Sequence, residues 1–307
     1  AGAGEQSAAT LPSSSPSLGR THLPASDTPE PPTPAPTESL APPTLSPSPT
    51  TQAALTPTDP PVTTLLFTGN IVPARCVQAR IDELDDYDYP YEDVREIIQG
   101  ADLAVGVLNA TLSDIPERTG CVPTYILVGD PRNADALARA GFDMMSVATN
   151  HIKDCGAVGC GDKAFLDTLE NLRRVGIAPV GAGRNHAEAV QPVAVTLNGV
   201  RFGFVSLGQL QQGGVFAGPD TPGIAVLSPE NVPAAIEATR QIADVVIAMP
   251  HWGPEDVSWP NYLQRDLAQQ LVAAGADLVV GNHTHVVQAV QEINDVPVFY
   301  GLGNFVF

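Results

Sequence analysis

The sequence predicts an α/β fold on three observations. Short apolar runs rich in β-branched residues recur along the chain, and amphipathic helical patterns lie between several of them. Two further pairs of apolar runs flank turn residues in the manner of β-hairpins. Alternating strands and helices with added hairpins predict two mixed sheets packed face to face with helices outside, a four-layer α/β/β/α sandwich.

Residues 1–60 are expected to form a disordered stalk, and residues 61–307 one folded domain. The first part is dense in proline, serine, threonine and alanine, so it cannot bury enough apolar surface to offset the entropy of ordering. Such a stalk commonly follows a signal peptide or an anchor helix. We therefore expect a location on the extracellular side of the cell envelope, with a missing N-terminal signal or anchor segment.

Apolar runs and helical patterns give the expected elements in order. The predicted strands cover residues 62–68, 103–108, 144–148, 178–180, 245–249 and 278–280. The predicted helices cover residues 134–140, 164–175, 233–242 and 262–274. One hairpin is expected to join 193–197 to 202–207 through Asn198-Gly199, and another to join 286–293 to 298–302 through Asn294-Asp295.

The formal net charge of −19 argues against a nucleic-acid partner. A surface for nucleic acid or anionic membranes needs clustered lysine and arginine, which the sequence lacks. Acidic residues concentrate between positions 82 and 93, interleaved with Tyr87, Tyr89 and Tyr91. We interpret this run as a solvated surface and keep cation binding as the less favoured alternative.

The four cysteines fit an exported protein with two disulfides, which three connectivities could provide. We expect Cys76 to pair with Cys121, and Cys155 with the nearby Cys160. A zinc ribbon is disfavoured because no Cys-x-x-Cys pair is present.

Side chains that can bind a metal follow five of the predicted strands. Functional groups of α/β sheets gather just beyond the C-terminal ends of strands. The candidates are Asn70, Asn109, Asn150, His151, His251, His283 and His285. Four of the six histidines lie at these positions, which favours one shared site over separate structural roles.

Imidazole nitrogens and amide oxygens suit zinc, manganese or iron, each of which can activate a water molecule and polarise a phosphoryl or carbonyl oxygen. Two divalent ions close together repel each other and normally require carboxylates between them. The positions expected to supply carboxylates hold Asn70 and Asn109. We therefore expect one divalent ion or none.

An ordered series of motifs covers residues 142–151, Asp154, Gly156, Gly159 and residues 180–183, 251–255, 275–286 and 300–305. This series resembles the CapA family of poly-γ-glutamate capsule-synthesis proteins. The resemblance implies a metallophosphoesterase-like sandwich and a role in the synthesis, export or surface anchoring of poly-γ-glutamate. It also implies metal-site roles for Asn150, His151, His251, His283 and His285, and membrane-bound capsule synthesis proteins as partners.

The chain departs from the family pattern at the acidic positions. Members usually have Gly-Asp where this chain has Gly69-Asn70, and Asn-Leu-Glu where it has residues 107–109. They also tend to have Asn-Asn-His at residues 149–151, and histidine where Asn282 stands. The resemblance therefore implies a partly degenerate metal site, leaves enzymatic activity unassigned, and suggests that a segment beyond Phe307 is missing.

Three functional hypotheses stay open at this point. The first is a cell-surface accessory protein of anionic polymer synthesis with a weakened metal centre. The second is a metal-dependent phosphoesterase with one ion, in which His151 or His251 assists proton transfer on a phosphoester substrate. The third is a binding or scaffolding module in which the histidines are structural.

Overall fold

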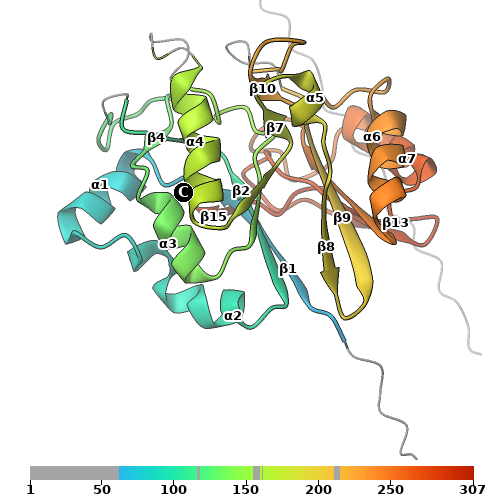
Figure 1. The fold of residues 1–307 in the computed structure, drawn as a ribbon, viewed down its shortest axis with the longest axis horizontal. Coiled ribbons are helices and arrows are strands. Elements are labelled where there is room, and N and C mark those ends of the chain that lie inside the picture. The colour runs from blue at the N-terminus through green and yellow to red at the C-terminus, as the bar shows by residue number, and fades with distance from the viewer. Residues whose placement is uncertain (1–61, 116–117, 155–159, 161, 211–214) are drawn as a thin grey trace, which may run out of the picture. The chain divides into compact units, whose positions relative to one another are not determined.

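A parallel five-stranded sheet forms the first half of the fold. The computed structural model of the protein describes residues 62–115, 118–154, 160, 162–210 and 215–307, so the expected stalk lies outside the described residues. The strand order is β15 (Asn304–Val306), β1 (Leu65–Ile71), β2 (Leu103–Leu108), β5 (Met144–Ser146) and β6 (Ala178–Val180). All of these neighbours pair in parallel (Figure 1).

A mixed six-stranded sheet forms the second half. Its order is β13 (Val290–Ile293), β14 (Val296–Phe299), β12 (Leu278–Val280), β11 (Val245–His251), β9 (Val200–Gly208) and β8 (Val193–Leu197). Both predicted hairpins are confirmed, because β8 with β9 and β13 with β14 pair antiparallel. The described residues also form two two-stranded sheets. In one, β3 (Thr111–Leu112) pairs with β4 (Val128–Gly129), and in the other, β7 (Ala182–Gly183) pairs with β10 (Gly223–Ile224).

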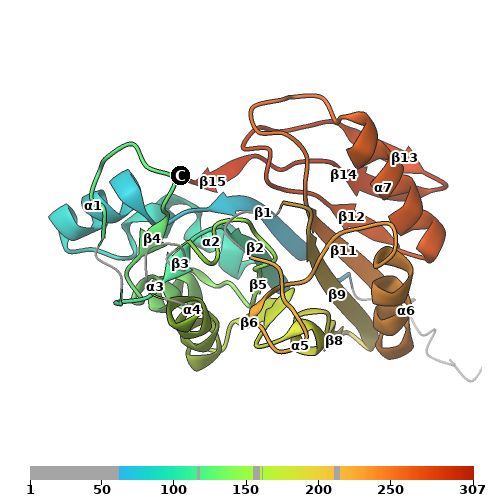
Figure 2. The same cartoon turned by 90° about the horizontal axis from the view of Figure 1, so that it is seen from above.

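Helices cover the outer faces of the two large sheets. Beside the first sheet lie α1 (Arg75–Leu84), the 3-10 helix η1 (Tyr89–Val94), α2 (Arg95–Gln99), α3 (Asn133–Ala140) and α4 (Lys163–Arg174). Beside the second sheet lie α6 (Val232–Ile242) and α7 (Tyr262–Ala274), while the short α5 (His186–Ala189) contacts β7 and β10. Figure 2 shows the resulting order of layers, which confirms the predicted α/β/β/α sandwich.

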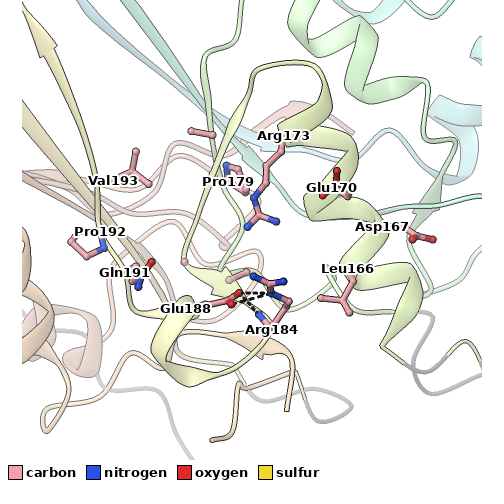
Figure 3. Close-up of a pocket in the computed structure, with 13 residues that line it drawn as sticks. Leu166, Asp167, Glu170, Arg173, Pro179, Arg184, Glu188, Gln191, Pro192 and Val193 are labelled. Carbon is pink, nitrogen blue, oxygen red and sulfur yellow. Dashed lines mark hydrogen bonds and ion pairs between the residues drawn. The ribbon is translucent and has the colours of Figure 1, made fainter. Parts of the chain in front are cut away.

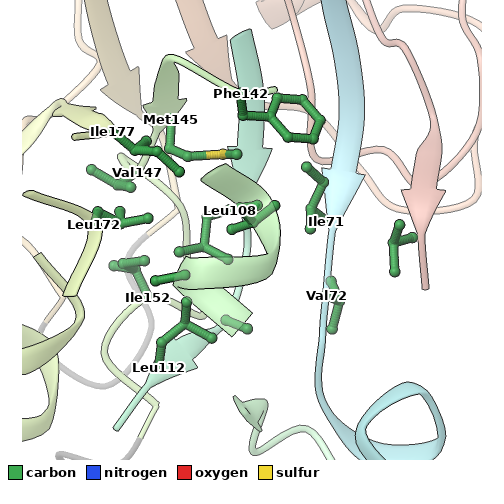
Figure 4. Packing of buried hydrophobic residues seen from close by; sticks show 14 of the residues in the cluster. Ile71, Val72, Leu108, Leu112, Phe142, Met145, Val147, Ile152, Leu172 and Ile177 are labelled. Atoms are coloured by element: carbon green, nitrogen blue, oxygen red, sulfur yellow. The ribbon is translucent and has the colours of Figure 1, made fainter. Parts of the chain in front are cut away.

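Three apolar cores follow from these four layers. Leu108 and Met145 of the first sheet share one cluster with Leu172 of α4 (Figure 4). A second cluster lies between the second sheet and its helices α6 and α7. Val105 on the first sheet and Phe204 on the second belong to the third, between the sheets. Strand β2 is apolar throughout because both faces of the sheet are buried.

Two differences from the sequence-based expectation concern β1 and α1. Gly69 was expected to end the first strand, but β1 continues to Ile71. A Cβ on Gly69 would lie 2.1 Å from the carbonyl oxygen of Gly303, so glycine here lets β1 and β15 approach closely. The segment from Arg75 to Gln99 was not predicted as helical, although its Tyr91 is fully buried.

The acidic run contacts arginines at three of its described positions, one of which is Glu83, paired with Arg80 at 2.7 Å. Asp82 accepts a hydrogen bond from Arg118 at 2.8 Å, and Asp88 pairs with Arg139 at 2.8 Å. These exposed pairs support the interpretation of a solvated, charge-paired surface.

The predicted disulfide between Cys76 and Cys121 is present and ties α1 to the loop before β4. The second expected pair includes Cys155, which lies outside the described residues. In the part of the chain that the structure describes, no helix has the length and apolar character needed to cross a membrane.

Candidate functional site

The five loops predicted to carry ligands meet at the C-terminal ends of strands from both sheets. We call the group the histidine site. It consists of Asn70, Asn109, Asn150, His151, His251, His283, His285 and Asn304. All of these residues except His285 and Asn304 are buried. The parallel direction of β1, β2, β5, β11 and β12 explains the convergence, because their C-terminal ends share one side of the sandwich.

A hydrogen bond between His251 and Asn150 joins the two sheets across the site. Nε2 of His251 lies 2.9 Å from Oδ1 of Asn150 and 3.2 Å from Nδ1 of His283. Because an amide oxygen only accepts, His251 Nε2 carries the proton, and Nδ1 of His283 faces that N–H with a lone pair. The imidazole rings of His251 and His283 lie with their centroids 4.8 Å apart.

Burial keeps the two inner histidines neutral. It lowers the pKa of His251 well below its usual value, and the neighbouring imidazoles lower it further. Burial, followed by the charges of His285 and His151, lowers the pKa of His283 to about 3. Both rings are therefore lone-pair acceptors at neutral pH and cannot donate a proton as imidazolium ions.

His151 is oriented by Asp154, which was part of a family motif but not among the candidate site residues. Nδ1 of His151 donates to Oδ2 of Asp154 at 2.7 Å, and the same oxygen accepts from the backbone N–H of Leu127 at 2.6 Å. Burial raises the pKa of Asp154, while the hydrogen bond with His151 opposes the rise. This arrangement leaves Nε2 of His151 as the acceptor nitrogen.

Asn304 was also missed by sequence reasoning, although it links two predicted residues. Its Oδ1 accepts from Nδ1 of His285 at 2.8 Å and from Nδ2 of Asn70 at 3.4 Å. The available signal was the parallel pairing of β15 with β1, which places Asn304 opposite Asn70. In the sequence, the only signal for Asn304 was its place in the matching motif at residues 300–305.

His283 and His285 both lie at the site, in the segment that follows β12. Their backbones have φ angles of 96° and 59°. This segment sets the rings with centroids 6.0 Å apart, His283 buried and His285 partly exposed.

The side chains do not fit a dinuclear metal centre. Among the described residues, no three His, Cys, Asp or Glu side chains are placed to hold a metal ion together. At the histidine site and the adjoining Asn282, three buried acceptor atoms nevertheless have no hydrogen-bond partner among the described residues, namely Asn70 Oδ1, His251 Nδ1 and Asn282 Oδ1. A single cation or a water molecule would satisfy atoms of this kind.

Hollows in the surface lie both at the histidine site and away from it. The hollow at the mouth of the site has a volume of about 180 Å³ and is lined by His151, His285 and Asn304, among others. A larger hollow, about 870 Å³, lies beside α4, β6, α5 and β8 (Figure 3). There Arg184 pairs with Glu188 at 2.9 Å, and the lining includes no residue of the histidine site. The chemistry of the histidine residues therefore belongs to the smaller hollow.

Comparison with known sequences gives a consistent result. A family model described as bacterial capsule synthesis protein PGA_cap matches residues 64–307. PGA biosynthesis protein CapA of Bacillus subtilis is 29% identical over 242 residues, covering 78% of this chain and 62% of that protein. Capsule biosynthesis protein CapA of Bacillus anthracis is 29% identical over 250 residues, covering 80% of this chain and 59% of that protein. The chain thus spans about three fifths of the length of these curated relatives.

A more distant relative and two solved structures are also similar. A probable polyglutamine synthesis accessory protein of Mycobacterium tuberculosis is 26% identical, covering 78% of this chain and 65% of that protein. A phosphatase from Mycoplasma pneumoniae is 13% identical with a TM-score of 0.44, covering 78% of this chain and 72% of that one. A 5'-nucleotidase precursor from Thermus thermophilus is 15% identical with a TM-score of 0.44, covering 80% and 49%. Nothing about activity follows from structural similarity this low.

Proposed function

Because this chain belongs to the bacterial capsule synthesis protein family, we propose that it is an accessory protein in the synthesis, export or surface anchoring of poly-γ-glutamate or a similar anionic polymer. It acts on the extracellular side of the cell envelope, together with membrane-bound capsule synthesis proteins. It works by binding, and its histidine site holds one divalent ion at most. The names of the Bacillus relatives support a role in capsule synthesis.

The pair of amides at positions 70 and 109 carries this proposal. Asn70 and Asn109 are fully buried, and each already has a partner in the site. Nδ2 of Asn70 lies 3.4 Å from Oδ1 of Asn304, and Oδ1 of Asn109 accepts from the backbone N–H of His151 at 3.2 Å. Neutral amides supply no charge to offset two divalent ions, so a hydrolytic dinuclear centre is disfavoured.

Complementation in the protein's own host tests the binding role. We expect deletion of the gene to reduce the acidic polymer on the cell surface. Restoration should follow from the native chain and equally from a chain with His283→Asn, because the buried ring of His283 does not line the hollow at the mouth of the site. If the native chain alone restores the polymer, although both chains are present in equal amounts, the non-hydrolytic proposal is wrong.

Restoring the acids tests the account of the site itself. The double substitution Asn70→Asp with Asn109→Glu should raise the affinity for Mn²⁺ or Zn²⁺ on the order of 100-fold, because two carboxylates then face the cation. Calorimetric titration measures the affinity, and elemental analysis counts the ions. The matched control is Asn109→Gln, which has the size of glutamate without its charge. Equal affinities of the control and the double variant would contradict the account.

The three unpaired acceptor atoms favour a second candidate function, a phosphoesterase with one metal ion. The ligands would be the amide oxygen of Asn70 and one or two of His251, His283 and His285, because no three His, Cys, Asp or Glu side chains among the described residues are placed to hold an ion together. Such an ion, when bound, polarises a phosphoryl oxygen and lowers the pKa of its water. His151, oriented through Asp154, would accept a proton at Nε2.

Metal analysis separates the two candidates. Near-stoichiometric metal in the dialysed native chain, lost on His283→Asn, together with turnover of a generic phosphodiester, would favour the phosphoesterase. Less than one ion per chain and no turnover would favour the accessory protein.

A further inference from the structure

Among the described residues of this strongly acidic chain, no carboxylate pairs with Arg75. Among the lysines and arginines that the structure describes, all but three have a carboxylate oxygen within 4.0 Å. The three exceptions are Arg75, Arg173 and Arg265. Of these, only Arg75 lines the hollow at the mouth of the histidine site, within the described residues. An unpaired guanidinium next to a site is a candidate for anion recognition.

The guanidinium of Arg75 is held in place from two sides. It lies over the ring of Phe307, 4.8 Å from the centroid, and Nη1 donates to the carbonyl oxygen of Thr124 at 3.3 Å. The backbone of Arg75 has a φ of 48°, which is uncommon for a residue with a side chain and occurs often at functional positions. Most of its five N–H donors remain without a protein acceptor among the described residues.

Two hollows meet at this side chain. The hollow of the histidine site continues past Arg75 and Phe307 to a second one of about 490 Å³, because both residues line both hollows. The second hollow is mainly apolar and includes the disulfide of Cys76 and Cys121 in its wall. An extended ligand could therefore occupy both hollows and pass beside the guanidinium.

We propose that Arg75 binds a carboxylate of an acidic polyamide that lies across these two hollows. The inference rests on the proposed function and assigns a residue and a place to its polymer. Glu255 and Asp256 line the same hollow, so a dianionic phosphate would be repelled there. The N–H groups of a polyamide can donate hydrogen bonds to the carboxylates of Glu255 and Asp256. A carboxylate of the polyamide can accept two parallel hydrogen bonds from the planar guanidinium of Arg75.

Calorimetric titration of the full 307-residue chain with poly-γ-glutamate of defined length tests the proposal. We expect Arg75→Gln to weaken binding by at least about tenfold, the loss of one charged hydrogen-bonded contact. Arg75→Lys should lose part of the affinity, because an ammonium keeps the charge without the fork. The matched controls Arg173→Gln and Arg265→Gln remove an equal charge and should bind like the native chain. The same polymer with amidated carboxylates should not bind.

Several results would overturn the assignment. The assignment is wrong if Arg75→Gln binds the polymer as tightly as the native chain, or if the Arg173→Gln control loses as much affinity as Arg75→Gln. It is also wrong if inorganic phosphate at matched charge displaces the polymer, or if the native chain does not bind the polymer. Thermal unfolding checks that each variant is folded. If Arg75→Gln does not fold, the affinity of Arg75→Lys for the polymer decides the test. If gene deletion removes the surface polymer but Arg75→Gln does not weaken polymer binding, the proposed function stands and only the role of Arg75 is refuted. If the polymer is intact after deletion, the proposed function itself is refuted.

Discussion

Acidification from pH 7 to pH 5 should destabilise the fold through His283. Burial and the neighbouring imidazoles lower the pKa of its ring to about 3, whereas the ring titrates near 6.5 in the unfolded chain. Between these values the unfolded chain binds a proton that the folded chain does not. The stabilising contribution of neutral His283 is therefore present above pH 6.5 and is lost as the pH falls. The loss from pH 7 to pH 5 is about 2 kcal/mol.

Urea unfolding of the native chain and of His283→Asn at both pH values measures this contribution. Asparagine tolerates the positive φ of this position better than most residues and does not titrate. Between pH 7 and pH 5, the free energy of unfolding of the native chain should fall by about 2 kcal/mol more than that of His283→Asn. A difference that is the same at both pH values would refute the reasoning, because His283 would then titrate alike in both states.

Two further predictions concern stability. Ser146→Ala should cost about 1–3 kcal/mol in urea unfolding, because it leaves the hydroxyl of Ser206, 2.7 Å away between the sheets, buried and unpaired. The double change with Ser206→Ala should cost less than the sum of the single changes, and additive costs would contradict the pairing. Replacing Cys76 and Cys121 by alanine should lower the free energy of unfolding by about 4 kcal/mol, since the disulfide closes a 45-residue loop. An unchanged denaturation midpoint would show that the unfolded chain is already constrained there.

The strands were predictable where they form short, uninterrupted apolar runs in the sequence. The runs at residues 103–108, 178–180 and 278–280 match β2, β6 and β12. The end of β1 was not predictable, because the role of Gly69 depends on the close approach of Gly303. Helix α1 was hidden for another reason, because its acidic C-terminal end resembles a solvated loop.

In the candidate site, the sequence identified the side chains but not their partners. Strand ends predicted the positions of His151, His251 and His283, because parallel strands direct their C-terminal loops to one place. The partners Asp154 and Asn304 depend on loop geometry and on the pairing of β15 with β1. The metal-binding role of these residues stays a prediction.

The placement of β15 has a consequence for the order of folding during synthesis. Strand β1 pairs on one side with β2, about forty residues later, but its other side pairs with β15, where Asn70 lies opposite Asn304. That edge of β1 is uncovered until nearly all of the described chain has left the ribosome. An open parallel edge is a site for mispairing between nascent chains. We therefore expect the protein to depend on chaperones until β15 is in place.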